Sequence, residues 1–104
     1  MQTQITARHF DASPELRTYA AERIERLERY YDGITDVRLV LDVATNGATD
    51  KTAEMTVNVY RQQLAASESG RTHEDAIDRC VRRLRRQLKR YKAKLRSTDQ
   101  DYHR

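Results

Sequence analysis

The sequence predicts a single α+β domain with the element order β-α-β-β-β-α, in which a four-stranded sheet carries two helices on one face. Four short segments alternate apolar and polar residues, as half-buried strands do, and two long segments repeat apolar residues at helical spacing. A chain of 104 residues with 38% hydrophobic content can bury one modest core. We therefore expect one domain over residues 1–96 and a short disordered tail over residues 97–104.

The first strand and the first helix are predicted in the N-terminal third of the chain. Apolar residues alternate with polar ones from Gln4 to His9, which is typical of a short strand. The run Ser13-Pro14-Glu15 then offers a hydroxyl cap, a proline whose fixed φ suits the first turn, and an acid near the positive end of the helix dipole. We expect this helix to reach about Tyr31 and to stop at Gly33. Its predicted core face consists of Leu16, Ala20, Ile24, Leu27 and Tyr31.

Three further strands are predicted in the middle of the chain. Residues 36–43 and 53–60 alternate apolar and polar side chains, and residues 45–50 have turn chemistry, so the two segments should form a hairpin. A weaker strand follows over residues 64–70. The order strand, helix, strand predicts a parallel pair with a right-handed crossover, continued by an antiparallel meander. On this pattern Tyr60 is a lone aromatic on the open sheet face, too little for a base-stacking platform.

The second helix is predicted to begin at a hydroxyl cap, Thr72, with Glu74 and Asp75 in its first turn. At about 1.5 Å per residue, a helix of roughly 24 residues outreaches a strand of about six, so its last turns should project past the sheet. The expected apolar side consists of Ile77, Cys80, Val81, Leu84, Leu88, Tyr91 and Leu95. Without Cys80, the spacing of these residues also fits a heptad seam for a partner helix, but the sheet needs this helix as a cover, which favours core packing.

Positive charge is concentrated in one segment of the chain. Residues 79–96 hold ten Lys and Arg and no acid, whereas the rest of the chain holds ten cations against sixteen Asp and Glu. The net charge of +4 therefore combines a strongly basic segment with an acidic body. A field of this kind favours a polyanionic partner.

The cations of the second helix form a stripe opposite its apolar side. Its members are Arg79, Arg83, Arg86, Arg90 and Lys94. Like charges at this spacing repel each other, so helix stability does not explain them, whereas a bound polyanion does. The first helix adds a second row, and the end of the first strand could extend it: Arg23, Arg26, Arg29 and Arg8. Because arginine grips phosphate oxygens with paired hydrogen bonds and stacks on exposed bases, the pattern favours structured RNA.

Two other interpretations of the stripe stay open. A charged helix face is ordinarily just solvated, although such faces usually mix the two signs of charge. A basic amphipathic helix can also lie on an anionic membrane. The membrane interpretation is disfavoured because the apolar side lacks Trp and Phe and is needed for the core.

Catalysis finds little support in the sequence. His9, His73 and His103 lie in three different contexts, no motif places a nucleophile, and Cys80 lies among apolar helix positions, where a thiol is usually inert packing. The histidines and the cysteine lack the spacing of a zinc site. We expect no enzyme activity, catalytic residue, metal, cofactor or small-molecule substrate. With no membrane span or signal-peptide core in the sequence, we expect a cytoplasmic protein.

Four stretches of the chain carry a resemblance to a known family. They are the Ile-Thr-Ala-Arg-His-Phe run from Ile5 to Phe10, the Glu-Arg-Leu-Glu-Arg-Tyr run from Glu25 to Tyr30, the strand from Ala53 to Val59, and the helix from Ala76 to Lys94. In this order they span nearly the whole chain. The sequence resembles the ribosome hibernation promoting factor family, also called ribosome-associated inhibitor A or sigma-54 modulation proteins.

The resemblance implies a fold similar to double-stranded RNA-binding domains, in agreement with the element order derived above. It implies binding to the small ribosomal subunit and the 70S ribosome, in the channel used by mRNA and tRNA, and a block of translation in stressed or stationary cells. The contacts would run from basic residues of both helices to 16S rRNA. Positions that match the family's basic pattern are Arg8, Arg23, Arg26, Arg29, Arg83, Arg86, Arg90 and Lys94. Whether Arg82, Arg85 and Lys89 touch RNA stays open.

The resemblance is to the short form of the family. Long members carry a second domain that pairs two ribosomes, so we do not expect this chain to pair ribosomes directly. Whether a separate ribosome modulation factor assists it stays open. Two further functions remain as alternatives: a general double-stranded RNA-binding module, and a protein-interaction regulator of the kind that the sigma-factor name suggests.

Overall fold

The computed structural model describes residues 2–44 and 51–102, with side chains described as far as Arg96. Four strands and two helices follow one another in the predicted order β-α-β-β-β-α. Their bounds are β1 Gln2–Ala7, α1 Pro14–Tyr30, β2 Asp36–Val43, β3 Lys51–Val59, β4 Gln62–Gly70 and α2 His73–Tyr102.

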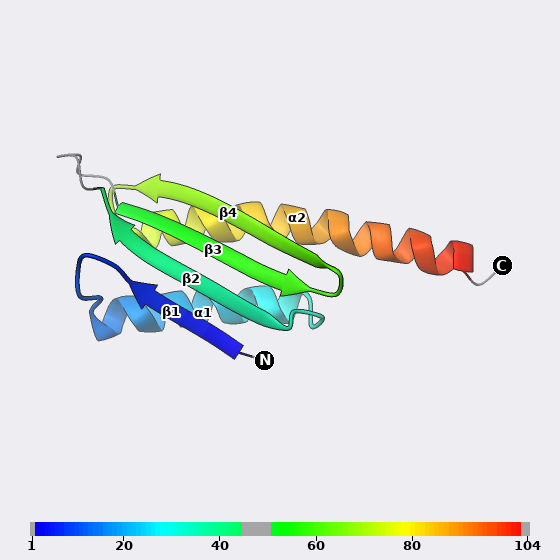
Figure 1. Cartoon of the computed structure of the whole chain (residues 1–104), viewed down its shortest axis with the longest axis horizontal. Helices are drawn as coiled ribbons and strands as arrows, with labels where there is room; N and C mark the ends of the chain where they lie inside the picture. Colours follow the sequence, from blue (N-terminus) through cyan, green and yellow to red (C-terminus); the bar gives the residue numbers. More distant parts are fainter. Residues whose placement is uncertain (1, 45–50, 103–104) are drawn as a thin grey trace.

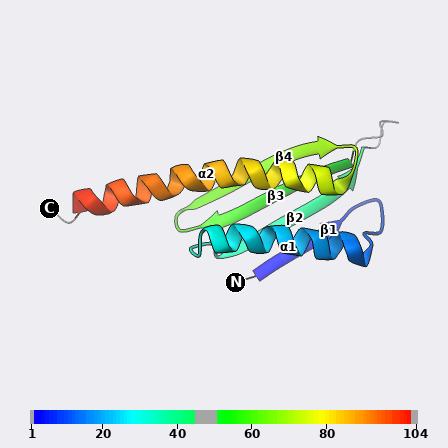
Figure 2. The same ribbon diagram turned by 180° about the vertical axis from the view of Figure 1, so that it is seen from behind.

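The strands form one mixed sheet in the order β1-β2-β3-β4. Strand β1 pairs parallel with β2, whereas β2 with β3 and β3 with β4 pair antiparallel. Both helices cover the same face of this sheet, and the other face is open, as the views from the two sides show (Figures 1 and 2). The α+β class, the parallel pair and the meander are therefore confirmed.

Both predicted helix caps are formed. The Ser13 hydroxyl oxygen accepts a hydrogen bond from the Leu16 backbone N–H at 3.1 Å, and Pro14 occupies the first turn of α1. The Thr72 hydroxyl likewise accepts from the Asp75 N–H at 3.0 Å. Helix α1 ends at Tyr30, one residue before the predicted end, because Tyr31 is already extended and forms the C-cap.

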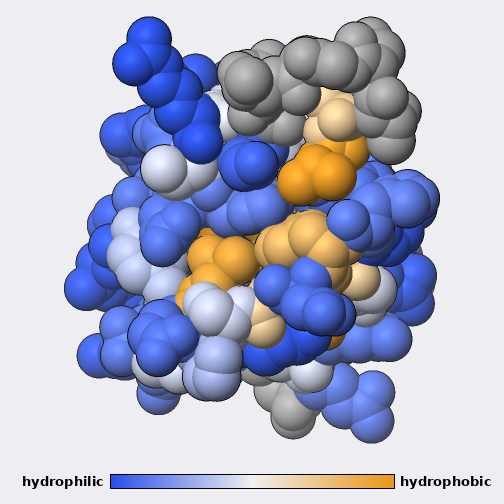
Figure 3. Space-filling model, turned by 90° about the vertical axis from the view of Figure 1, so that its left-hand side faces the viewer, coloured by the Kyte–Doolittle hydropathy of each residue, from blue (hydrophilic) through white to orange (hydrophobic). Residues whose placement is uncertain are grey.

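One hydrophobic core lies between the sheet and the helices. Strands β2 and β3 contribute every second side chain to it, and the buried side of α2 matches the predicted apolar side except that Val81 and Leu95 are only partly covered. Seen from the end where both helices begin, the surface is mostly hydrophilic around a small apolar centre (Figure 3). The fully buried large side chains are Ile24, Leu27, Val37, Leu39, Leu41, Met55, Val57, Ile77, Cys80, Leu84 and Leu88.

The strand ends differ from the prediction for local reasons. Strand β1 ends at Ala7 instead of His9, since His9 has a φ of 67°, which an extended strand does not adopt. Tyr60 was placed on the open sheet face, but it lies in the turn between β3 and β4 with Arg61. The predicted hairpin turn over residues 45–50 lies outside the described residues.

Helix α2 is longer than the sequence predicted. It continues to Tyr102, so its backbone runs six residues into the segment that we expected to be a disordered tail. No Gly or Pro follows Gly70, so the sequence supplies no residue that stops the helix. As expected, the last turns of α2 extend beyond the β3–β4 turn (Figure 1).

Truncating the centre of the α2 side that packs on the sheet should destabilise the fold. Leu84 is fully buried, so Leu84→Ala is expected to lower the free energy of unfolding by about 2–5 kcal/mol. Urea denaturation followed by circular dichroism measures this. Lys89→Ala, on the exposed side of the same helix, is the matched control and should change stability by less than about 0.5 kcal/mol. Equal losses in the two variants would contradict the assigned core side.

Candidate nucleic-acid interface

Helix α2 has a basic hollow along each of its flanks. The first, here called the interhelical groove, lies between α1 and α2 and is lined by Arg23, Arg26, Leu27, Arg29, Tyr30, Asp78, Val81, Arg82 and Arg85. The second, here called the helix–strand groove, lies between α2 and β4 and is lined by Gln62, Leu64, Arg83, Arg86, Gln87, Arg90, Tyr91 and Lys94. The residues of the predicted stripe lie together on the flank toward β4, where Arg79 shares a shallow hollow with Arg83 and Arg86. Arg82 and Arg85 line the other groove, so the cations of α2 are divided between two hollows.

The division follows from how α2 packs. Its apolar side points to the sheet, so the charged residues on either side of this contact face different neighbours. Arg82 and Arg85 fall on the flank toward α1, while Arg83 and Arg90 fall on the flank toward β4. Arg86 lines the helix–strand groove and also a shallow hollow with Arg82, Arg85 and Lys89 that joins the two flanks. The basic surface is thus continuous around the exposed side of the helix.

One acid holds the two helices together at the start of the interhelical groove. The Arg23 Nε donates to Asp78 at 2.9 Å, the Tyr19 hydroxyl donates to the same carboxylate at 2.7 Å, and the Arg23 guanidinium also lies over the Tyr19 ring. Burial, and then the hydrogen bond to Asp78, raise the pKa of Tyr19, so the phenol stays a donor. Arg23 is therefore mainly a link between α1 and α2, and its charge is already matched.

Three further predicted site residues also have acidic partners. Arg79 forms an i,i+4 ion pair with Asp75 at 3.5 Å, and Arg83 donates to Glu68 on β4 at 2.6 Å. The third, Arg8, is described below. Such exposed pairs contribute little to stability and exchange readily with another anion. Acidic side chains thus already engage Arg79 and Arg83 near the start of α2.

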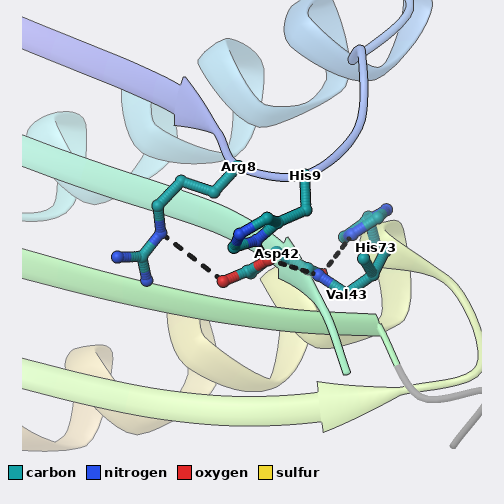
Figure 4. Close-up of polar contacts among 5 residues, drawn as sticks. All are labelled: Arg8, His9, Asp42, Val43 and His73. Atoms are coloured by element: carbon teal, nitrogen blue, oxygen red, sulfur yellow. Dashed lines mark hydrogen bonds and ion pairs between the residues drawn. The ribbon is translucent and has the colours of Figure 1, made fainter. Parts of the chain in front are cut away.

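Arg8 lies apart from both grooves. It follows β1 and pairs with Asp42 at 3.5 Å, next to His9, whose Nδ1 lies 2.9 Å from the same carboxylate (Figure 4). The hydrogen bond from His9, together with that from the Val43 N–H, lowers the pKa of Asp42. His73 lies beside this cluster, with its Nε2 2.8 Å from the Asp42 carbonyl oxygen (Figure 4). The structure therefore does not place Arg8 with the helix cations.

Several cations beside the grooves have no acidic partner within the described part of the chain. Arg26 and Arg29 on α1 are exposed, and so are Arg86 and Arg90 on α2. No ion pair joins any of these four to an acid among residues 2–44 and 51–96. They are guanidinium groups held on rigid helices with their charge unmatched, which is the arrangement that binds phosphate.

The structure brings together most of the predicted site residues, in two groups. Arg23, Arg26 and Arg29 line the interhelical groove, and Arg83, Arg86, Arg90 and Lys94 line the helix–strand groove. Arg79 lies at the start of the stripe, in a shallow hollow with Glu68. Arg82 and Arg85, for which the sequence predicted no definite role, complete the interhelical groove. Arg79, Arg82 and Arg85 follow one another at three-residue intervals, and this spacing was the sequence signal that could have placed Arg82 and Arg85 on one flank of the helix.

An aromatic ring lies among these cations. Tyr30, at the end of α1, lines the interhelical groove, with the guanidinium of Arg85 5.0 Å and the ammonium of Lys92 4.6 Å from its ring centroid. Lys92 also approaches the Tyr30 carbonyl oxygen at 3.5 Å. The ring therefore fixes two long cationic side chains of α2 against α1.

Within the described residues, neither a cluster of potential metal ligands nor a helix able to cross a membrane is found. The thiol of Cys80 is fully buried, and it donates to the carbonyl oxygens of Ala53 and Ala66 at 3.4 and 3.6 Å. Burial raises its pKa to about 11, so the reactive thiolate is scarce near neutral pH. Cys80 is a packing residue, as expected.

The fold and the surface define a small α+β domain with a basic two-helix face, a class of protein that acts by binding. The chain belongs to the Sigma 54 modulation protein / S30EA ribosomal protein family, whose model matches residues 3–96. Proteins of this family are ribosome-binding factors without enzymatic activity. Both the family and its lack of enzymatic activity agree with what the sequence predicted.

Several proteins named ribosome hibernation promoting factor are similar to this chain over nearly its whole length. The ribosome hibernation promoting factor of Escherichia coli is 33% identical over 95 residues, covering 91% of this chain and 97% of the relative. That of Azotobacter vinelandii is 35% identical over 97 residues, covering 90% and 85%. The ribosome hibernation promotion factor of Deinococcus radiodurans is 32% identical, but only 49% of its length is covered. This chain is thus a homologue of the ribosome hibernation promoting factors.

Two solved structures have the same fold. The N-terminal domain of Protein Y from Thermus thermophilus superimposes with a TM-score of 0.74 at 30% identity, covering 85% of this chain and 94% of that one. A ribosomal subunit interface protein from Coxiella burnetii superimposes with a TM-score of 0.81 at 22% identity, covering 89% and 99%. The second likeness bears on the fold alone.

The buried thiol should leave a signature in the pH dependence of stability. The thiol of the unfolded chain loses its proton near its ordinary pKa of 9.0, whereas the folded thiol keeps it until about 11. Stability is therefore expected to fall as pH rises through this interval, because the unfolded chain binds fewer protons. Urea denaturation at a series of pH values should show a steeper loss for the wild type than for Cys80→Ala. Parallel curves would contradict a buried, protonated Cys80.

Proposed function

We propose that this chain is a ribosome hibernation factor that binds 16S rRNA of the small subunit, alone or in the 70S ribosome, through both flanks of α2. Seated in the channel used by mRNA and tRNA, it would stop translation in stressed or stationary cells by occlusion, without chemistry. The site of action would be the cytoplasm. The names of the relatives support the partner, and the basic surface supports the mode of contact.

The observation that carries this proposal is a set of exposed arginines beside the two grooves that form no ion pair with an acid among residues 2–44 and 51–96. Arg26 and Arg29 stand on one side of α2, while Arg86 and Arg90 stand on the other. Unmatched like charges on one helix repel each other, so the free protein gains nothing from them. Phosphate oxygens would relieve this repulsion and accept paired hydrogen bonds from each guanidinium.

Ribosomal RNA fits this surface better than a small anion does. Cations flank α2 on two sides, so a single phosphate could reach only one of the grooves. Folded RNA presents several backbone segments at once, and basic proteins recognise its shape mainly through phosphate and ribose contacts. Helix α2 would then lie between neighbouring backbone segments, with the open face of the sheet turned away.

Charge reversal tests the surface. We expect Arg86→Glu/Arg90→Glu and Arg26→Glu/Arg29→Glu each to abolish co-sedimentation with 30S subunits and 70S ribosomes in sucrose gradients, because each pair exchanges phosphate attraction for repulsion. Arg38→Glu/Arg71→Glu is the matched control, since it makes the same change in net charge at exposed positions outside both grooves. This control should still co-sediment.

The outcomes separate the proposed function from its alternative. Loss of binding in the control as well would mean that net charge alone matters, and unchanged binding of both groove variants would reject the proposed surface. Excess competitor duplex RNA should leave ribosome binding intact. Displacement by the duplex would favour a general double-stranded RNA-binding module instead.

Ribosome binding should also weaken with salt in a defined way. Contact with about six phosphates predicts that the logarithm of the binding constant falls with the logarithm of salt concentration at a slope of roughly −4 to −5. Replacing two contacts, in Arg86→Gln/Arg90→Gln, should reduce this slope by roughly 1.5 to 2. Filter binding to 30S subunits over a salt series measures both slopes. A salt-independent affinity would point to a protein partner.

A further inference from the structure

The turn between β3 and β4 exposes an aromatic ring beside a cation. Tyr60 is 63% exposed and is the large hydrophobic side chain that the described part of the chain leaves uncovered. The guanidinium carbon of Arg61 lies 5.2 Å from the centroid of its ring. Single exposed apolar residues are common on protein surfaces, so exposure alone assigns Tyr60 no role, and only the surroundings of the ring can assign one.

The backbone of this turn is under strain. Strands β3 and β4 are joined by only two residues, since Val59 pairs with Gln62, and Arg61 has a φ of 62°. A turn of this kind favours glycine or asparagine at the second position, because a side chain there crowds the backbone. The strain is tolerated although glycine would remove it. Strained residues of this sort gather at binding sites.

Helix α2 also holds the β3–β4 turn in place. The Tyr91 hydroxyl donates to the Tyr60 carbonyl oxygen at 2.7 Å, and Tyr91 is itself buried, with its ring against Tyr31. Burial raises the pKa of Tyr91, so its hydroxyl remains a donor. Tyr60 is therefore presented on a rigid turn and not on a mobile loop.

The fixed tip stands at the end of the helix–strand groove. Gln62, the residue that follows the turn, lines this groove together with Arg86 and Arg90, and Tyr91 both lines it and holds the turn. Both ribbon views place the β3–β4 turn next to α2, before its projecting last turns (Figures 1 and 2). A polyphosphate chain lying in the groove would therefore bring its next nucleotides to Tyr60.

We propose that the β3–β4 turn binds an unpaired RNA base, which stacks on the Tyr60 ring while the adjoining phosphates lie in the helix–strand groove. The inference rests on the proposed function and names the kind of rRNA element that this groove takes: a bulge, loop or strand end, not a continuous duplex. Bases within a duplex are stacked on their neighbours and offer no free face, whereas unpaired bases stack on aromatic rings and on guanidinium planes. Arg61 would add its charge at the same point.

A fluorescent base tests the contact directly. The probe is an RNA hairpin with 2-aminopurine as a single bulged base, and the comparison probe carries 2-aminopurine within the paired stem. Wild-type protein is expected to change the emission of the bulged base and not that of the paired base. Tyr60→Ala should lose this change and bind the bulged probe about 5- to 100-fold more weakly, in line with the effect of removing one stacking ring. Tyr60→Phe keeps the ring and should behave as the wild type.

Each outcome supports the inference or overturns it. Equal binding and equal emission with Tyr60→Ala would overturn it, and so would a defect of Tyr60→Ala on 30S subunits that the bulged probe does not reproduce, since this would mean a protein contact. Gln63→Ala, two residues beyond the turn on β4, is the matched control and should retain the emission change. Sedimentation of the wild type with 30S subunits is measured in parallel. Its failure, with the emission change retained, would reject the ribosomal function and leave the base contact standing.

Arg61 provides a second, independent readout. Arg61→Gly removes the backbone strain, so we expect the midpoint of thermal unfolding to rise by up to about 4–8 °C, while the affinity for the bulged probe falls. Higher stability together with weaker RNA binding in this variant would indicate that Arg61 contacts the RNA. A rise in stability with unchanged affinity would show that Arg61 takes no part.

Discussion

The packing of α2 on β3 and β4 is the constraint on which the other features depend. Its apolar side is buried from Ile77 to Tyr91, so the rotation of the helix about its own axis is fixed. Once the rotation is fixed, the remaining α2 side chains as far as Arg96 have an assigned direction: toward α1, toward β4, or outward. The long basic side chains cannot turn away from one another, and their mutual repulsion is a built-in cost of the fold.

Acidic residues of β4 and of α2 itself offset this cost near the start of α2. Asp75, Asp78 and Glu68 meet Arg79, Arg23 and Arg83, which stabilises the junction of the two helices and the sheet. Further along the helix, no ion pair joins Arg86 or Arg90 to an acid among residues 2–44 and 51–96, and both arginines line the helix–strand groove. The cations of α2 therefore differ in role: Arg79 and Arg83 are held in ion pairs, whereas Arg86 and Arg90 carry charge that is available to a partner.

Most of the fold could be predicted from the sequence, because its signals are local. Ser13 and Thr72 satisfy backbone N–H groups within their own turns, and the alternation in β2 and β3 reflects burial of one face. The arrangement of the site could not be predicted as well, because it depends on which neighbour each flank of α2 meets. Spacing alone placed Arg83 and Arg86 in one stripe. Only the folded structure shows that Arg83 forms an ion pair with Glu68 on β4, whereas Arg86 forms none with the described acids. The turn position of Tyr60 depends on the register of β3 with β4, which no local pattern specifies.

The basic helix α2 gives the molecule an asymmetric charge distribution. Residues 79–96 hold ten cations and no acid, whereas acids outnumber cations in the rest of the chain. Because α2 continues past the sheet (Figure 1), positive charge is displaced toward this helix. A molecule with this asymmetry experiences a torque in the field of a polyanion before any contact forms. It would arrive helix first, and its rate of capture, not only its final affinity, would respond to the ionic strength of the medium.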